Sequence, residues 1–327
     1  MHRSNLARLA VMAGLCSSLA LPVAAYAETW VGDSQLGGTV ATAPEQDAVK
    51  PNGGQYKYAK EELAAFCHFG PNTFSGVEWG TDYGTGRPTA TEYMNRLTSF
   101  DADGYVEMIK EAGFKRLIVT AKHHDGFCIW DSPSTDYDMG STTSKIDILA
   151  ELSAACSKYD VDMGLYLSPW DIHEPTYGNS DGNKDNYNAF YDGQLREILG
   201  NQKYGNNGKF VEVWMDGAKG TGADAQDYDF KRFADTIKEL EGNDCVLFQC
   251  GKQSEVRWVG NENGLAGDTA WNRVKMNANW NPSSAEVPWD KNIQQDSSVG
   301  AEVSVGAPDG EQWIMPEADA RITAGWF

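Results

Sequence analysis

From about residue 58 onward, the chain alternates short apolar runs with amphipathic stretches. Runs rich in aliphatic and aromatic residues predict buried strands, and apolar positions at helical spacing between them predict helices. The predicted strands cover residues 64–69, 115–121, 161–167, 210–215 and 245–250. The predicted helices cover residues 103–112, 146–158, 187–199 and 228–240. A repeated strand–loop–helix unit implies a parallel sheet.

This order of elements predicts an α/β fold. A (β/α)8-type TIM barrel over residues 58–327 is the leading architecture, because the loops after the strand ends are long and the length suits one domain. A doubly wound open sheet is the alternative. No glycine-rich dinucleotide motif follows a predicted strand. Asp101 or Asp103 is expected to cap the first predicted helix and Gly113 to end it.

The first 27 residues differ from the rest of the chain. Arg3 and Arg8 flank the start of an apolar run, and residues 25–27 (AYA) form a small-x-small cleavage signal. We expect a cleaved signal peptide, bacterial export and an extracellular location, with an uncleaved anchor or a lipoprotein signal as the alternative. Residues 28–57 lack clear periodicity and are expected to form an extended leader. No other segment is long and apolar enough to span a bilayer, so no membrane insertion is expected after cleavage.

The C-terminal end is unusual for a barrel. Residues 322–327 are strand-like, and no helix follows them. A βα barrel is not expected to end on a strand, which favours a chain truncated at its C-terminus.

The charge narrows the range of partners. The formal net charge is −20, and loss of Arg3 and Arg8 with the signal peptide makes it more negative. Such a chain repels phosphate backbones, which excludes nucleic acid as a partner and disfavours anionic substrates. The five cysteines that follow residue 27 are widely spaced, so we expect mostly free, buried thiols, with one bridge left open.

The strand over residues 210–215 leads directly to a carboxylate, Asp216, between Met215 and Gly217. Active sites of α/β proteins lie at such C-terminal strand ends. A second acid, Glu262, follows about one βα unit later, and adjacent barrel strands could bring the two together. Paired carboxylates framed by tryptophans suggest glycosidic bond cleavage. A helix-capping or turn role for Asp216 and a solvated loop position for Glu262 are the structural alternatives.

Histidines and aromatic residues concentrate near the same strand ends. His68, His123 and His124 lie at or just after predicted strands, where a barrel gathers them around one pocket. Neutral imidazoles suit the hydroxyl groups of a neutral polyol. Adjacent histidines on an extended segment point to opposite sides, and the zincin spacing is absent, so no metal or other cofactor is expected. Trp79, Trp130, Trp170 and Trp258 fall in loop contexts, where a pocket wall is at least as reasonable as core packing.

Several motifs, in order, resemble glycoside hydrolase family 29, the α-L-fucosidases. They begin with His68-Phe69-Gly70 and Glu78-Trp79, and continue through Ala121-Lys122-His123-His124-Asp125-Gly126-Phe127, Leu165-Tyr166-Leu167-Ser168-Pro169-Trp170-Asp171 and Trp214-Met215-Asp216-Gly217. The resemblance covers roughly residues 57–327. Family members commonly continue past Gly325-Trp326-Phe327 into a β-sandwich domain, which is expected to be missing here.

The resemblance implies a secreted, retaining α-L-fucosidase without a cofactor, acting on fucosylated oligosaccharides or glycoconjugates. Asp216 would be the nucleophile and Glu262 the acid/base. The residues implied to bind fucose are His68, Glu78, Trp79, His123, His124, Tyr166 and Trp214. The block from Arg257 to Glu262 resembles the subgroup that prefers α-1,3/1,4-linked fucose on Lewis-type glycans. The alternatives are a fucose- or glycan-binding homologue without turnover and, third, a metal-dependent hydrolase.

Overall fold

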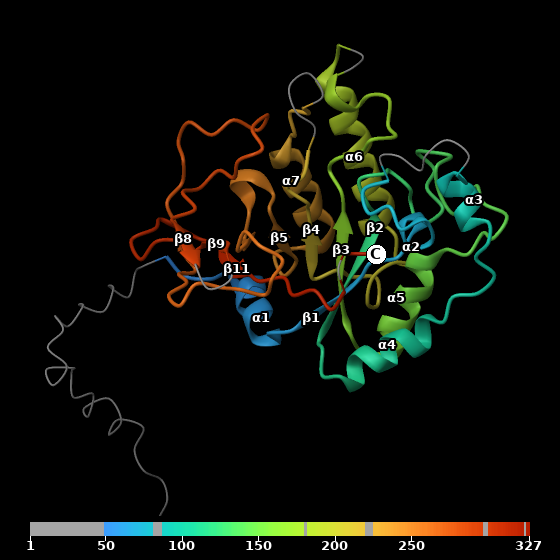
Figure 1. Ribbon diagram of the computed structural model, residues 1–327, viewed down its shortest axis with the longest axis horizontal. Helices are drawn as coiled ribbons and strands as arrows, with labels where there is room; N and C mark the ends of the chain where they lie inside the picture. Colours follow the sequence, from blue (N-terminus) through green and yellow to red (C-terminus); the bar gives the residue numbers. More distant parts are fainter. Residues whose placement is uncertain (1–48, 81–86, 180–181, 220–224, 297–299, 324) are drawn as a thin grey trace, which may run out of the picture. The chain divides into compact units, whose positions relative to one another are not determined.

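The computed structural model describes residues 49–80, 87–179, 182–219, 225–296, 300–323 and 325–327 (Figure 1). The expected signal peptide and residues 28–48 of the expected leader lie outside this range. Residues 53–57 were expected to be extended but instead begin helix α1 (Gly53–Glu61). The helix starts there because Asn52 and Gln55 form a capping box, in which the Asn52 side chain accepts a hydrogen bond from the Gln55 N–H (2.8 Å).

Within the described ranges, seven parallel strands form one sheet in the order β1-β2-β3-β4-β5-β6-β11. The strands are β1 (Ala64–Cys67), β2 (Arg116–Lys122), β3 (Asp162–Leu167), β4 (Glu212–Trp214), β5 (Val246–Phe248), β6 (Val256–Trp258) and β11 (Met315–Glu317). The order follows the sequence without the reversal that defines a doubly wound sheet. The predicted α/β fold of (β/α)8 type is therefore confirmed as a curled parallel sheet with helices.

Helices connect most of these strands. They are α2 (Pro71–Ser75), α3 (Ala90–Met94), α4 (Ala102–Glu111), α5 (Ile148–Tyr159), α6 (Lys184–Leu199) and α7 (Phe230–Glu241), with short 3-10 turns η2 (Tyr177–Asn179) and η4 (Gly251–Gln253). Helix α4 packs beside α5, and α6 beside α7 (Figure 1). Asp101, one of the two expected caps, accepts a hydrogen bond from the Gly104 N–H (3.0 Å), which satisfies a donor that the first turn leaves free.

The two faces of the sheet bury different clusters. Leu117 and Val119 on β2 pack with the helices, whereas Ile118 between them joins the cluster on the other face. Successive strand residues point to opposite faces, so one strand supplies both clusters. The cluster that contains Ile118 is rich in aromatic residues, which come from the C-terminal parts of the strands: Tyr166, Trp214 and Phe248.

The segment between β6 and β11 forms two small antiparallel sheets that the sequence pattern did not predict. They pair β7 (Arg273–Val274) with β10 (Gln312–Trp313), and β8 (Ile293–Asp296) with β9 (Ala301–Ser304). The expected strand over residues 322–327 was wrong, because the described residues there form bends and no strand. Among the described residues the last strand is β11, and Trp326 packs against His68 (ring centroids 4.5 Å apart) instead of extending a sheet.

The described cysteines are all free and buried, which confirms the expectation of unpaired thiols. Burial in apolar surroundings raises the pKa of the Cys67 and Cys156 thiols to about 12. These groups are therefore neutral packing residues. Among the helices of the described ranges, none is long and apolar enough to cross a bilayer.

Candidate active site

The C-terminal ends of β1, β2, β3 and β4 bring together the side chains that the sequence singled out. His68 follows β1, His123 and His124 follow β2, Tyr166 lies near the end of β3, and Asp216 follows β4. His123 stacks on Tyr166 with ring centroids 5.7 Å apart, and its ring lies 4.2 Å from that of His124. Parallel strands end at one edge of the sheet, so residues that are distant in sequence meet there.

Asp216 is the carboxylate at the centre of this group. Its Oδ1 accepts a hydrogen bond from the Ala218 N–H (2.7 Å), and its Oδ2 accepts one from the Tyr166 hydroxyl (2.9 Å). Oδ1 therefore closes a turn, which is the turn role considered for Asp216 from the sequence. Oδ2 is directed at the histidine group. Burial raises the pKa of Asp216, and the Ala218 N–H, His123 and Tyr166 partly oppose that rise.

The three histidines are neutral. Burial lowers the pKa of His68 and of His124 to about 3, and burial together with the neighbouring His124 lowers the pKa of His123. In the part of the chain that the structure describes, the buried His68 Nδ1 has no hydrogen-bond partner. Neutral imidazoles can both donate and accept hydrogen bonds, which suits the recognition of hydroxyl groups.

Glu78 and Trp79 lie in the loop after α2. Trp79 is 47% exposed, and its ring makes edge-to-face contacts with His124 (5.5 Å) and Trp170 (5.4 Å). The Glu78 Oε2 accepts a hydrogen bond from the Trp326 N–H (3.3 Å). An exposed indole beside a buried histidine is available to an apolar face of a ligand, as expected of a pocket wall.

Trp214 is buried beneath the histidines. Its ring stacks on Phe248 (4.0 Å) and on Tyr166 (5.1 Å), and its indole Nε1 donates to the Glu317 Oε1 (2.8 Å). This fully partnered indole forms an aromatic layer of the barrel interior. Trp130, one of the loop tryptophans considered for a pocket wall, is instead 1% exposed and donates to Glu197.

Glu262 lies in the loop after β6, and its side chain is 32% exposed. Its Oε2 pairs with the Arg321 Nη1 at 3.4 Å. Glu262 and Asp216 both raise the pKa of a third acid, Asp319, through charge repulsion. Glu262 and Asp216 are thus both close enough to Asp319 to affect its pKa. No hydrogen bond joins the two acids directly in the described chain.

Two neighbours of this group were missed at the sequence level. Burial and the charges of Glu317, Glu262 and Asp216 raise the pKa of Asp319 to about 8. Trp326 lies within 6.0 Å, between ring centroids, of His123, Tyr166 and Trp214. The sequence does contain a signal for each: Asp319 comes just after an apolar run, and Trp326 lies beside a glycine. Only the pairing of β11 brings these two residues to the site.

No group of three or more histidine, cysteine, aspartate or glutamate side chains that could hold a metal ion occurs among the residues described. The group contains a carboxylate whose side chain is 16% exposed, neutral imidazoles and aromatic rings. Such a set suits a neutral polyol with an apolar face.

The loop that follows His124 depends on Gly126. This residue has φ +82°, and a Cβ built there would lie 2.3 Å from the Asp171 Oδ1. We expect Gly126→Ala to lower the free energy of unfolding by about 3–5 kcal/mol, because left-handed strain adds to a clash within a buried ion pair. Gly113 is the matched control, since it has φ +92° and open space around it. Gly113→Ala should lose only about 1–2 kcal/mol in urea unfolding, and equal losses would contradict the clash.

A parallel βα domain with a carboxylate, histidines and aromatic rings at its strand ends is typical of glycoside hydrolases. The chain belongs to the α-L-fucosidase family, because the family model described as alpha-L-fucosidase matches residues 41–281.

Three related proteins support this family assignment. The chain is 51% identical to a Ruminococcus gnavus GH29 fucosidase solved in complex with fucose, with a TM-score of 0.75, over 91% of this chain and 60% of that one. It is 39% identical to SpGH29, with a TM-score of 0.71, over 86% of this chain and 57% of that one. It is 38% identical to alpha-L-fucosidase 1 of Arabidopsis thaliana, over 85% of this chain and 49% of that protein. The chain therefore spans about half to three fifths of the length of these relatives.

Proposed function

We propose that this protein is a retaining α-L-fucosidase that removes terminal fucose from glycans. The observation that carries the proposal is the placement of Asp216 among neutral histidines and aromatic rings in a chain of this family. Support for the sugar comes from the Ruminococcus gnavus relative, which was solved in complex with fucose.

In the proposed first step, an Asp216 oxygen attacks the anomeric carbon while the bond to the glycosidic oxygen breaks. Glu262 gives its proton to the departing oxygen, which leaves as an alcohol. In the second step Glu262 takes a proton from water, and the water oxygen displaces Asp216 from the anomeric carbon. Two inversions at that carbon give net retention.

Of the remaining pocket residues, five are proposed to bind the sugar and two to support Asp216. The histidines His68, His123 and His124, with Glu78, exchange hydrogen bonds with the fucose hydroxyls. Trp79 covers an apolar face of the ring, and its exposure supports that role. Tyr166 holds Asp216 through the 2.9 Å hydrogen bond. Trp214 supports Tyr166 from below.

We also propose a preference for α-1,3/1,4-linked fucose. The support is the resemblance of the block from Arg257 to Glu262 to that subgroup. Arg257 is fully buried, and its guanidinium donates to backbone oxygens of Ser304 (2.9 Å) and Trp271 (2.9 Å). Because these bonds anchor the base of the loop, Arg257 acts by positioning Glu262.

A digest of Lewis a, Lewis x and 2′-fucosyllactose tests activity and linkage together. We expect fucose release from the two Lewis trisaccharides and little from 2′-fucosyllactose, measured by chromatography of the products. Release from none of the three would remove the proposed function. Release chiefly from 2′-fucosyllactose would leave the fucosidase proposal standing and remove the linkage preference.

Export with a cleaved signal peptide is proposed from residues 1–27. Expression in a bacterial host should give a protein in the periplasm or medium that begins at Glu28 by mass spectrometry of the intact chain. A product that keeps residues 1–27 would contradict cleavage.

The acidic limb of the pH–rate profile follows from the Asp216 pKa. Burial raises this pKa above the ordinary 3.8, and only the ionised carboxylate attacks, so activity should be lost as pH falls through the raised pKa. We expect the midpoint of the acidic limb of kcat/KM to lie above 3.8. His124→Asn should lower activity without moving this midpoint, because the pKa of His124 is about 3. A midpoint at or below 3.8, with the fold intact by circular dichroism, would contradict the assignment.

A further inference from the structure

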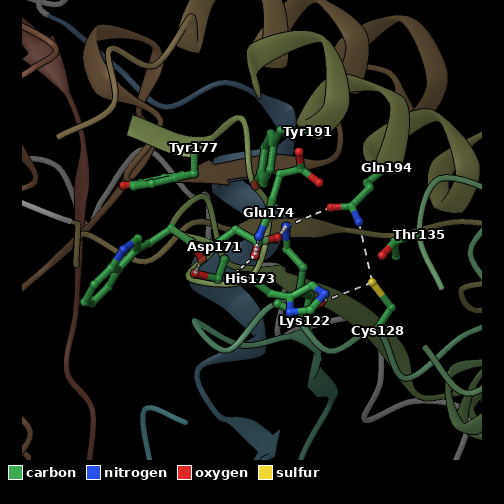
Figure 2. Close-up of polar contacts among 12 residues, drawn as sticks. Lys122, Cys128, Thr135, Asp171, His173, Glu174, Tyr177, Tyr191 and Gln194 are labelled. Atoms are coloured by element: carbon green, nitrogen blue, oxygen red, sulfur yellow. Dashed lines mark hydrogen bonds and ion pairs between the residues drawn. The ribbon is translucent and has the colours of Figure 1, made fainter. Parts of the chain in front are cut away.

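A buried ion pair lies behind the histidine-bearing strand end, and the proposed reaction does not use it. The Lys122 Nζ is 2.9 Å from the Asp171 Oδ2 and 2.7 Å from the Gln194 Oε1 (Figure 2). The side chains of Lys122 and Asp171 are 0% and 2% exposed. Three aromatic rings of α6 surround the ammonium, each with its centroid within 6.0 Å: Tyr187, Phe190 and Tyr191. Burying two charges is unfavourable, so the pair calls for an explanation beyond stability.

Asp171 organises the loop after β3. Its second oxygen, Oδ1, accepts hydrogen bonds from the backbone N–H groups of His173 (3.0 Å) and Glu174 (2.9 Å). With the Lys122 ammonium on Oδ2, three donors engage both oxygens of the carboxylate (Figure 2). These contacts tie the start of the loop to the Lys122–Asp171 pair.

The same loop is joined to the end of β2. The Ser168 N–H donates to the Lys122 carbonyl (2.9 Å), and the Ile172 N–H donates to the His124 carbonyl (2.9 Å). These bonds bring the Ser168 Oγ within 2.7 Å of the His124 Nδ1. Ser168 thus contacts the Lys122 backbone through its N–H and the active-site histidine through its hydroxyl.

The proton on Ser168 decides the state of His124. The Ser168 Oγ lies 2.7 Å from the Trp170 carbonyl oxygen, which can only accept. The Tyr166 hydroxyl, whose own proton goes to Asp216, is a second acceptor for the Ser168 proton. A hydroxyl has one proton to give, and either acceptor leaves Ser168 to accept from His124. The His124 Nδ1 then carries the proton, and Nε2 is bare.

We propose that Ser168, held by the Lys122–Asp171 pair, is a positioning residue that keeps His124 as the Nδ1-protonated tautomer. The bare Nε2 faces the Asp216 Oδ2 at 3.7 Å. The opposite tautomer would point an N–H at the Asp216 carboxylate and could not accept a hydrogen bond from the substrate. The bare Nε2 instead accepts the proton of a hydroxyl group of a neutral sugar. The kinetic part of this inference rests on the proposed fucosidase function, whereas the tautomer does not.

The tautomer is tested by 15N NMR of the imidazoles in the full chain, since protonated and bare ring nitrogens have well-separated shifts. The His124 signals are assigned by their loss in His124→Asn. We expect a protonated Nδ1 and a bare Nε2 in the unaltered protein, and a proton at least partly on Nε2 in Ser168→Ala. A proton on Nε2 in the unaltered protein overturns the proposal, and so does an unchanged His124 spectrum in Ser168→Ala. Both results are readable whether or not the protein hydrolyses fucosides.

Kinetics with 4-nitrophenyl α-L-fucoside give the second readout. Ser168→Ala should raise KM about tenfold, as expected when one well-placed hydrogen bond to substrate is lost. Ser153→Ala is the matched control, because Ser153 is equally buried but lies on α5, where its hydroxyl donates to the Leu149 carbonyl. Equal KM values for Ser168→Ala and the unaltered chain would overturn the role of the tautomer in binding.

The part played by the ion pair is tested with the double variant Lys122→Met/Asp171→Asn. This variant leaves no unpaired buried charge, so it avoids the large destabilisation that follows removal of one partner. We expect mixed His124 signals and a raised KM, with native circular dichroism. A His124 spectrum identical to that of the unaltered protein would show that Ser168 acts without the pair.

Discussion

Replacing Asp216 with alanine should lower kcat/KM for 4-nitrophenyl α-L-fucoside by about 10⁴-fold or more. In the proposed mechanism, no covalent fucosyl-enzyme can form without this carboxylate, and losses of this size accompany removal of a catalytic nucleophile. Fucose binding, measured by calorimetry, should persist, because the histidines and aromatic rings that would bind the sugar remain. The matched control is Asp235→Ala, which removes an exposed aspartate that pairs with Lys231 on α7.

Adding azide to Asp216→Ala tests whether Asp216 is the nucleophile. The small anion can enter the space that the Asp216 carboxylate vacates and attack the anomeric carbon from that side. The nitrophenolate leaves, and the product is β-L-fucosyl azide, which NMR identifies. Turnover of Asp216→Ala equal to that of Asp235→Ala would remove Asp216 as nucleophile. A variant that neither binds nor hydrolyses would instead show a disrupted pocket, so circular dichroism accompanies the measurement.

The second large effect is expected at Glu262 and depends on the leaving group. For Lewis x, kcat/KM of Glu262→Ala should fall by about 10²–10⁴-fold, because a sugar alkoxide is a poor leaving group without a proton donor. For 4-nitrophenyl α-L-fucoside, kcat/KM of Glu262→Ala should fall less than tenfold, since nitrophenolate leaves without protonation. The test therefore compares the loss of kcat/KM for Lewis x with the loss for the nitrophenyl substrate.

Asp319 makes this test a comparison of two acids. With a pKa raised to about 8, its carboxyl is protonated at neutral pH, as a general acid must be. If Glu262 is the acid, Asp319→Asn should affect both substrates alike. Leaving-group dependence in Asp319→Asn and none in Glu262→Ala would transfer the acid/base role to Asp319.

The order of the elements was predictable because it depends on local pattern. The buried run at residues 115–121 and the amphipathic stretch at 146–158 became β2 and α5 almost as expected, since the period of apolar residues reports which side is buried. Helix α1 was missed because its start depends on the capping residue Asn52 within a polar segment of weak periodicity. The pairs β7–β10 and β8–β9 were missed because strands of two to four residues carry little periodic signal.

The site was predictable in its residue types. His68, His123, His124 and Asp216 each lie at or just after the end of a predicted strand, and a parallel sheet brings such positions to one edge. Partner choice was not predictable in the same way. Asp319 and Trp326 join the site only because β11 pairs with β6. The contact between Ser168 and His124 depends on backbone bonds between two loops.

The sequence by itself determined the α/β class, the carboxylate at the end of β4 and the family, since hydrophobic period and motif order are properties of neighbouring residues. Only the tertiary structure decided which groups share a charge environment and which nitrogen of His124 carries a proton. The physical reason is that pKa values and tautomers depend on burial and on partners within a few ångströms, and the fold alone supplies those partners.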